Sequence, residues 1–139
     1  MKLLIINGPN LNLLGAREPQ IYGNTDLEAV LDTLRARFPQ VEILHEQSNH
    51  EGRIIDLIQQ ANANGISGIV LNPGGYSHSS VAIADAILAV ETPVVEVHIS
   101  NIFAREDFRQ RHVTAVGTRG FIAGFGIEGY ALAIQSLLK

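Results

Sequence analysis

Short apolar runs alternate along the chain with segments of helical period, and this alternation restricts the fold more than any other feature. The runs are rich in Val, Ile and Leu and hardly alternate with polar residues, which is typical of strands buried on both faces. They cover residues 2–6, 41–45, 68–72, 94–98 and 120–125. Apolar residues at helical spacing cover residues 25–38, 51–64, 79–90, 105–111 and 127–138. This fivefold strand-helix order predicts a parallel sheet covered by helices on both faces.

Five strands in this order favour an α/β, flavodoxin-like three-layer sandwich with strand order 2-1-3-4-5. The chain has 139 residues, of which 46% are hydrophobic, and this is enough for one substantial core. No linker, repeat or low-complexity tract interrupts it, so we expect a single domain over residues 1–139. In such sheets ligands bind beyond the carboxyl ends of the strands, so polar residues at those ends are the candidates for function.

Charge and hydropathy argue against two classes of partner. The formal net charge is −4 and no cluster of lysine or arginine is present, so we expect no nucleic-acid partner. No apolar stretch approaches the roughly 20 residues of a membrane span, and the run after Met1 ends too early for a signal peptide. We therefore expect a cytoplasmic protein without a membrane partner.

Residue usage argues against several kinds of chemistry. The chain has no cysteine, and its lysines are Lys2 and Lys139, so neither a thiolate nor an internal Schiff-base lysine is expected. Residues 124–129 match Gly-x-Gly-x-x-Gly, but too little chain follows for a second strand, and we interpret them as a tight turn. The two histidines in residues 45–50 are five apart and cannot share a helical face as a metalloprotease motif requires. We expect no metal and no cofactor.

The longest irregular segment, residues 8–23, carries an arginine and a tyrosine and has no hydrophobic period. A loop of this length inside a compact domain is usually functional, often as a lid. Arg17 in a closed site could favour the ionised form of Tyr22 and so make the phenol a base. A packing role for the tyrosine is the alternative.

A histidine ends the run at residues 94–98. His98 and Glu96 lie on the same side of the expected strand because side chains repeat every two residues. The carboxylate can then orient the imidazole. A structural histidine is the alternative, but the position beside Ser100, at a carboxyl strand end, favours a catalytic or binding role.

The run at residues 68–72 ends in a segment suited to an anionic ligand. Asn72 is followed by Gly74 and Gly75, which tolerate positive φ and let backbone amides approach a ligand closely. Residues 77–80 then open a helix whose N-terminus favours anions. Arg105 and Arg109 are four apart on the expected short helix and share a face, where one could clamp a carboxylate. A plain turn and solvated helix charge are the alternatives.

Taken together, these motifs resemble those of type II 3-dehydroquinate dehydratases over essentially the whole chain. They read Leu-Asn-x-Leu-Gly-x-Arg-Glu-Pro-x-x-Tyr-Gly, then Asn-Pro-Gly-Gly-x-x-His, then Glu-Val-His-Ile-Ser-Asn with Arg-Glu-x-Phe-Arg. The resemblance implies that Tyr22 is the proton acceptor and His98 the proton donor. It also implies that Arg17 stabilises the tyrosinate and the transition state, and that Asn12 holds a water near an enolate. The substrate-binding residues that it implies are Asn72, His78, Asp85, Ile99, Ser100 and Arg109, with Ile99 and Ser100 acting through backbone amides.

The resemblance further implies the reaction and the assembly. We expect a cofactor-free hydro-lyase that converts 3-dehydroquinate into 3-dehydroshikimate through an enolate, in the shikimate pathway, as a homododecamer built as a tetramer of trimers. The lysine distribution agrees, because type I enzymes need an internal Schiff-base lysine. Three alternatives stay open: the same reaction in quinate breakdown, another small carboxylic-acid dehydratase, and a non-catalytic flavodoxin-like module that holds a nucleotide or FMN.

Overall fold

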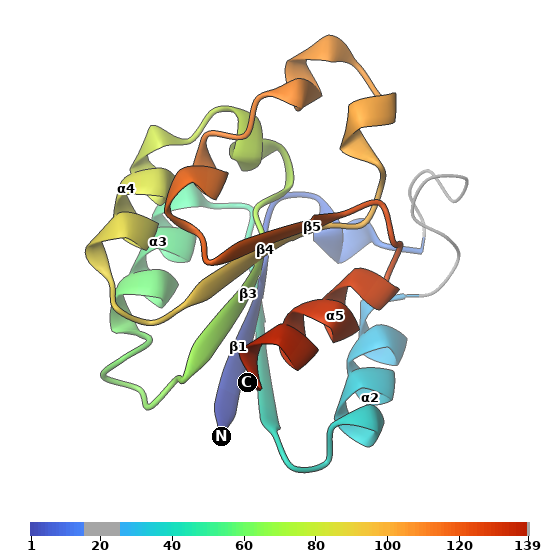
Figure 1. Cartoon of the computed structure of the whole chain (residues 1–139), viewed down its shortest axis with the longest axis vertical. Helices are drawn as coiled ribbons and strands as arrows, with labels where there is room; N and C mark the ends of the chain where they lie inside the picture. The colour runs from blue at the N-terminus through green and yellow to red at the C-terminus, as the bar shows by residue number, and fades with distance from the viewer. Residues whose placement is uncertain (16–25, 139) are drawn as a thin grey trace.

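A parallel sheet forms the centre of the computed structural model, which describes residues 1–15 and 26–138 (Figure 1). Its strands are β1 (Lys2–Asn7), β2 (Glu42–Gln47), β3 (Gly68–Asn72), β4 (Val94–His98) and β5 (Gly120–Ala123). Their order is β2-β1-β3-β4-β5, and every neighbouring pair is parallel. The predicted fold class and strand order are therefore confirmed.

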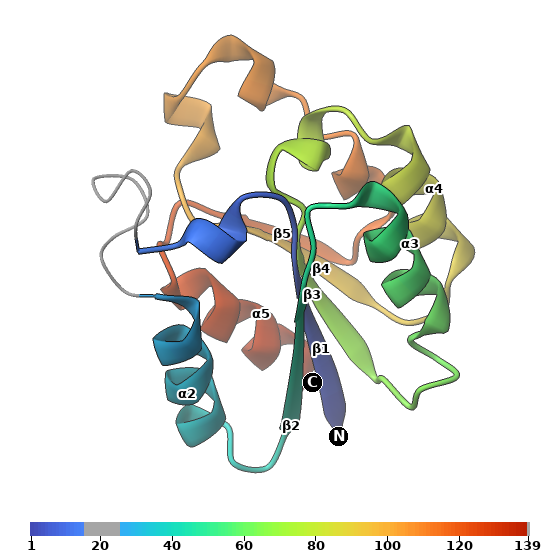
Figure 2. The same ribbon diagram turned by 180° about the vertical axis from the view of Figure 1, so that it is seen from behind.

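Helices cover both faces of this sheet. In the described residues the α-helices are α2 (Leu27–Arg37), α3 (Glu51–Gln60), α4 (Val81–Ala89) and α5 (Glu128–Leu137). Figures 1 and 2 show α2 and α5 on one face and α3 and α4 on the other. Asp26 caps α2 by accepting a hydrogen bond from the Ala29 amide at 2.9 Å. The helices are shorter than expected at their ends, but four of the five expected helices are present.

Two hydrophobic cores follow from the period of the strands. On β1, Leu3 and Ile5 pack in the core under α2 and α5, whereas Leu4 and Ile6 pack in the core under α3 and α4. Successive side chains of a strand point to opposite faces, so a strand between two helix layers must be apolar on both. Fully burying one such side chain contributes about 1.5–3 kcal/mol. The non-alternating runs of the sequence are explained by this arrangement.

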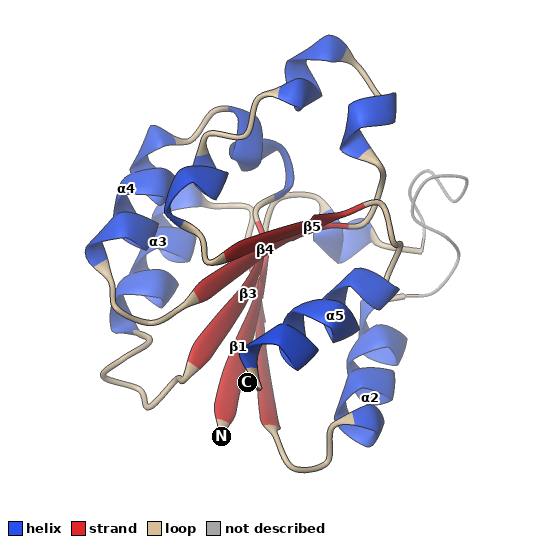
Figure 3. Ribbon diagram, viewed as in Figure 1, coloured by secondary structure: helices blue, strands red, loops and turns tan. Residues whose placement is uncertain are grey.

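The expected helix at residues 105–111 is wrong. The segment after β4 instead forms short 3-10 helices, seen as isolated turns in Figure 3: η3 (Ile102–Ala104), η4 (Asp107–Gln110) and η5 (Thr114–Gly117). The sequence of residues 105–111 has a single apolar side chain, Phe108, which is exposed, so no apolar stripe holds a helix against the sheet. Arg105 and Arg109 consequently do not share a helical face.

The carboxyl ends of the strands meet at one edge of the sheet. Asn7 lies in register with Gln47 on one side and with Asn72 on the other, while Glu96 lies beside Leu71. The segment after β4 that holds η3 and η4 extends beyond this edge before the chain returns through η5 to the start of β5 (Figure 1). None of the helices in the described part of the chain is long and apolar enough to cross a membrane.

Candidate active site

An open cavity of about 130 Å³ lies at the carboxyl edge of the sheet. Its lining comes from the loop after β1, the end of β3 with the 3-10 helix η2 (Gly74–His78), the end of β4, and the segment that follows β4. Its described lining residues are Pro9, Asn10, Leu11, Asn72, Gly74, Gly75, His78, His98, Ile99, Ser100, Ile102, Arg105 and Arg109. Two of these are arginines and none is a carboxylate, so the described lining suits an anionic ligand.

Most of the predicted site residues meet in this cavity. Those that line it are Asn72, Gly74, Gly75, His78, His98, Ile99, Ser100, Arg105 and Arg109. Asn12 is exposed on η1 (Leu11–Leu13) and Asp85 is exposed on α4, and neither lines the cavity. Arg17 and Tyr22 lie outside the described residues.

A buried carboxylate lies directly behind the His98 ring. Glu96 is 0% exposed, and its Oε2 lies 2.7 Å from Nε2 of His98. This is the contact that the strand period predicts. Because a carboxylate only accepts hydrogen bonds, Nε2 carries a proton, and Nδ1 is the ring nitrogen left for a ligand.

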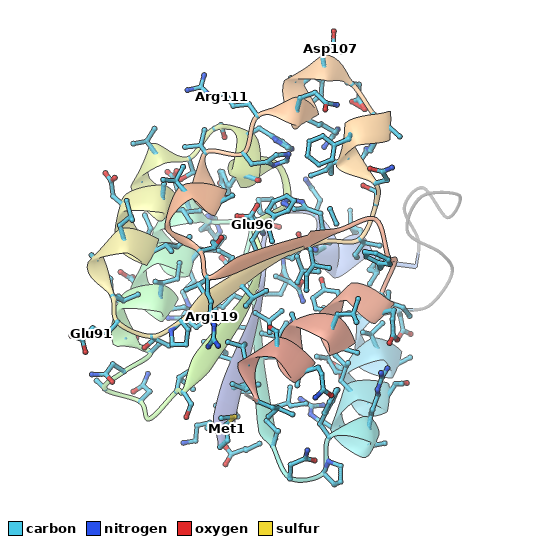
Figure 4. All side chains as sticks on the ribbon, in the orientation of Figure 1. Met1, Glu91, Glu96, Asp107, Arg111 and Arg119 are labelled. Carbon is cyan, nitrogen blue, oxygen red and sulfur yellow. The ribbon has the colours of Figure 1, made fainter. Side chains whose placement is uncertain are left out.

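Two hydroxyl groups complete the surroundings of Glu96. Ser77 Oγ donates to Oε2 at 2.7 Å, and Thr114 Oγ1 donates to Oε1 at 2.6 Å. Burial alone would raise the pKa of the Glu96 carboxyl, but the hydrogen bonds from His98, Thr114 and Ser77 together hold it below its ordinary value. Glu96 is therefore an ionised carboxylate inside the protein, close to the end of the sheet (Figure 4).

Two further imidazoles surround His98. The ring centroid of His78 lies 6.3 Å from that of His98, and the ring centroid of His112 lies 5.5 Å from it. Burial lowers the pKa of both rings below the ordinary histidine value, and the nearby His98 adds to the effect. We call Glu96, His98, Ser77, Thr114 and His112 the carboxylate cluster.

A second, uncharged cluster supports Asn72. The Tyr130 hydroxyl accepts a hydrogen bond from Nδ2 of Asn72 at 3.0 Å and donates one to Oδ1 of Asn7 at 2.5 Å. Asn7 Nδ2 in turn lies 3.1 Å from Nε2 of His45. Burial raises the pKa of Tyr130 far above its ordinary value, so the phenol stays neutral. We call Asn7, Asn72, Tyr130 and His45 the amide cluster.

The turn after Asn72 differs from the expectation in one respect. Gly74 has φ of +59°, and a Cβ there would lie 3.1 Å from the Pro9 carbonyl oxygen, so this position requires glycine. Gly75 does not have positive φ. The Gly74 amide donates to Oδ1 of Asn72 at 3.2 Å, which closes the turn. One glycine, rather than both, is used for its conformational freedom.

The start of α4 is also used differently from the expectation. Ser80 caps the helix by accepting a hydrogen bond from the Ile83 amide at 2.9 Å, and its hydroxyl donates to Oε2 of Glu51. Ser77 is turned toward Glu96 instead. Ser80 therefore caps the helix, and Ser77 supports the carboxylate cluster.

The two arginines approach the cavity from separate 3-10 segments. Arg105 donates from Nη1 to the Ser100 hydroxyl at 3.3 Å. Arg109 donates from Nε to Oε1 of the exposed Glu106 at 3.2 Å, and its guanidinium lies 4.9 Å from the Phe108 ring centroid. Both side chains are mostly covered, with 13% and 18% exposure. They supply positive charge at the wall of the cavity.

Several supporting residues escaped the sequence analysis. Thr114 and His112 come from an irregular segment with no period, and the amide of Val113 holds that segment in place by donating to the Ser77 carbonyl at 2.7 Å. Tyr130 lies on α5 and Asn7 on β1, 123 residues apart in sequence. No local pattern indicates such contacts. Position at a carboxyl strand end was the one signal that could have found Asn7.

One group of side chains has the spacing of a metal site. Within the described residues, Glu96, His98 and His112 each offer a ligand atom within 4.8 Å of the others. Zinc accepts such nitrogen and oxygen donors. In this structure Glu96 already accepts three hydrogen bonds, including the one from His98, so a cation would have to displace protons from the cluster.

Known proteins are similar to this chain in sequence and fold. The profile of the family described as dehydroquinase class II matches residues 1–138. A 3-dehydroquinate dehydratase from Caldicellulosiruptor saccharolyticus is 52% identical, over 98% of this chain and 95% of that protein. One from Carboxydothermus hydrogenoformans is 51% identical, over 99% of this chain and 90% of that protein. The crystal structure of type II dehydroquinase from Butyrivibrio crossotus superposes with a TM-score of 0.97 at 48% identity, covering 100% of this chain and 98% of that one.

Proposed function

This chain belongs to the class II dehydroquinase family, and on that premise we propose that its cavity removes water from 3-dehydroquinate by two proton transfers. The product is 3-dehydroshikimate, an intermediate of the shikimate pathway to chorismate and the aromatic amino acids. The observation that carries the proposal is the buried Glu96 carboxylate, which holds a cavity-lining imidazole beside two arginines. A module that only held a ligand would have no need of an imidazole backed by a buried carboxylate.

The reaction needs a base and an acid. The base removes the proton α to the ketone, and the electron pair of that C–H bond forms an enolate. The enolate then expels the β-hydroxyl, which takes a proton from the acid and leaves as water. In our proposal Tyr22 is the base and His98 the acid, so each turnover ends with a protonated Tyr22 and a neutral His98. A proton transfer between them, directly or through water, restores the starting state.

Glu96 prepares His98 for the second step. Its hydrogen bond to Nε2 fixes the ring orientation and directs Nδ1 to the ligand side. The negative charge stabilises the imidazolium that must be present before the hydroxyl leaves. Glu96 thus acts on the reaction through His98.

The lining of the cavity suits a polyhydroxylated carboxylate. We assign the substrate carboxylate to the backbone amides of Ile99 and Ser100, and the hydroxyl groups to Asn72, His78 and Arg109. The arginine charge at the wall favours an anion. The amide cluster keeps Asn72 in place, because its Oδ1 and one Nδ2 proton are already used inside the protein.

Two further roles rest on the family resemblance. We assign Arg17 to the stabilisation of the Tyr22 phenolate and Asn12 to a water near the enolate. A nearby cation lowers the free energy of a phenolate, and one pKa unit of such preference corresponds to about 1.4 kcal/mol. In this proposal the chain itself supplies every proton donor and acceptor.

We also propose a cytoplasmic homododecamer, built as a tetramer of trimers. Helix α4 and η5 expose apolar side chains, with Val81 61%, Leu88 61% and Val116 78% exposed, and such a face suits a second subunit. Asp85 lies on α4 and away from the cavity of its own chain, so its proposed substrate contact would be made in a neighbouring subunit. Light scattering that gave the mass of a single chain would contradict this assembly.

The test of function is the absorbance of the conjugated product when 3-dehydroquinate is added to purified protein in EDTA. Tyr22→Phe and His98→Ala should each lower kcat by about 10²–10⁴-fold. Tyr76→Phe is the matched control, because it removes a phenol hydroxyl whose partner is the Asn49 carbonyl outside the cavity lining, and it should retain turnover. Near-full turnover in Tyr22→Phe or His98→Ala would refute the role of that residue. No product from the folded wild type would refute the function itself.

A further inference from the structure

His112 belongs to the carboxylate cluster without touching the carboxylate. Its Nδ1 lies 3.0 Å from Ser77 Oγ, and that oxygen lies 2.7 Å from Oε2 of Glu96. Its ring also lies 5.0 Å from Phe121, centroid to centroid, and 5.6 Å from Phe103. The ring is therefore held between β5 and η3 with one nitrogen directed at Ser77.

The directions of these hydrogen bonds follow from counting protons. Ser77 has one hydroxyl proton, and the ionised Glu96 can only accept, so that proton is directed to Oε2. Ser77 Oγ must then accept from His112, and Nδ1 of His112 carries a proton. The bonds run from His112 to Ser77 to Glu96, and His98 donates to the same carboxylate oxygen, Oε2.

A second observation selects the same tautomer. Nε2 of His112 is buried and has no hydrogen-bond partner in the described part of the chain. When Nδ1 holds the proton of a neutral ring, Nε2 is a bare acceptor. An unpaired acceptor is more readily tolerated inside a protein than an unpaired N–H donor. The neutral Nδ1–H form is thus the one that the cluster accommodates.

We propose that His112 is a positioning residue for His98, acting through Ser77 and Glu96. Because His112 donates to the Ser77 oxygen, the Ser77 proton points to Glu96. The carboxylate then keeps all three hydrogen-bond donors, Ser77, His98 and Thr114, and a fixed orientation. The inference rests on the proposed role of His98 as the proton donor. It goes further in naming a residue outside the cavity lining that sets how firmly His98 keeps its proton.

The charged and titratable groups that face His112 fit this role. They are Glu96 and His98 on β4 and His78 on η2, and the backbone of Arg109 on η4 also interacts with the ring. Burial is the main cause that lowers the pKa of His112, and the two neighbouring imidazoles lower it further, so it lies below its ordinary value although Glu96 and the Arg109 backbone oppose the shift. A ring with a lowered pKa is neutral near pH 7, as the proposed donor role requires.

Removing the donor should change the pH profile of the reaction. In His112→Leu the Ser77 hydroxyl is free to turn away, and Glu96 is left with fewer donors. A carboxylate with fewer donors holds the His98 imidazolium more tightly, so the high-pH limb of kcat should move up by about one pH unit and kcat should fall by about tenfold. His112→Asn places an N–H near the position of Nδ1 and should restore most of both values.

The first experiment uses the resting protein and needs no turnover. Nitrogen-15 NMR of the histidine side chains should show His112 neutral with its proton on Nδ1. A proton on Nε2 instead would overturn the inference, whatever the enzyme's activity and even if no His112 variant folds. Because this readout is independent of the reaction, it also separates a failure here from a failure of the proposed function.

The second experiment is a double-mutant cycle on kcat and its high-pH limb. His112→Leu should have its full effect beside Ser77 and almost none in a Ser77→Ala background, because the effect passes through that hydroxyl. Equal effects in both backgrounds would overturn the proposed route. If His112→Leu lowered kcat without moving the high-pH limb, and His112→Asn did not restore kcat, His112 would have only a packing role.

Discussion

Two polar clusters lie on adjacent strands at the carboxyl edge of the sheet, and they differ in charge. The amide cluster joins Asn7 and Asn72 through the neutral Tyr130 hydroxyl, and Asn7 in turn contacts His45. The carboxylate cluster surrounds one ionised group, Glu96, with donors. Both are buried, but only the second places a charge in the interior beside the cavity.

The difference shows how one sheet edge can hold a ligand and handle protons. A neutral cluster fixes the position of an amide at the cavity wall and has no proton to release near neutral pH. A buried carboxylate with three donors remains charged and stabilises a cation next to it. We infer that the end of β3 mainly determines the shape of the cavity wall, whereas the end of β4 mainly determines the protonation of His98.

Removing the charge of Glu96 should have the largest effect and would test this division directly. Glu96→Gln keeps the size of the side chain but removes the partner of the imidazolium, so kcat should fall by about 10²-fold or more. Steady-state kinetics at several pH values would measure the fall. Ile43→Val, a conservative change in the core away from the cavity, serves as the control for small packing changes. If Glu96→Gln kept wild-type turnover, the carboxylate cluster would have no part in proton transfer.

Breaking the amide cluster should have a smaller effect, and mainly on stability. Tyr130→Phe removes the hydroxyl that joins Asn7 and Asn72 and leaves their buried amides short of a partner, at a cost of about 1–3 kcal/mol in the free energy of unfolding. KM should rise more than kcat falls, because Asn72 is lost as a fixed contact. Urea unfolding and kinetics would check both. A drop in kcat as large as that of Glu96→Gln, with unchanged stability, would contradict the comparison.

The smallest expected effect is a loss of stability in mild acid. Burial is the main cause that lowers the pKa of His45, His78 and His112, so the unfolded chain binds more protons than the folded one below about pH 6.5. Stability is therefore complete above that pH and is lost as the pH falls through the lowered pKa values. We expect at most about 1 kcal/mol between pH 7.5 and 5.5, because the rings are partly solvated.

Urea unfolding at fixed protein concentration would measure this loss, since assembly makes apparent stability depend on concentration. His45→Gln should flatten the pH dependence, whereas His50→Gln, at an exposed histidine, should leave it unchanged. Stability that rose as the pH fell would show that the buried rings are charged in the folded protein, against the assignment of neutral tautomers.

The fold could be predicted because its signals are local and repeated. Each strand is a short apolar run, and β1 is buried on both faces as its non-alternating sequence requires. The helix expected at residues 105–111 failed because spacing of charges was taken as a helical signal in a segment whose one apolar side chain, Phe108, is exposed. Without an apolar face to bury, such a short segment has little to stabilise a helix.

The site could be predicted only as far as strand ends reveal it. His98, Glu96 and Asn72 were found because parallel strands bring their carboxyl ends together. Thr114 and Tyr130 could not be found this way, since the return of an irregular segment and the packing of the last helix bring them in. Such contacts form between residues that are far apart in sequence, so no local sequence pattern predicts them.

The path of the chain separates its ends from the cavity. Strand β1 starts, and α5 finishes, at the amino edge of the sheet, opposite the carboxyl edge (Figure 1). A Cβ added at Gly68 would lie 3.1 Å from the side chains of both Leu3 and Leu137, so these two residues pack at the same point. An affinity tag, a fluorescent fusion or a linker to a solid support attached at either end would thus leave the cavity mouth of its own subunit open to substrate.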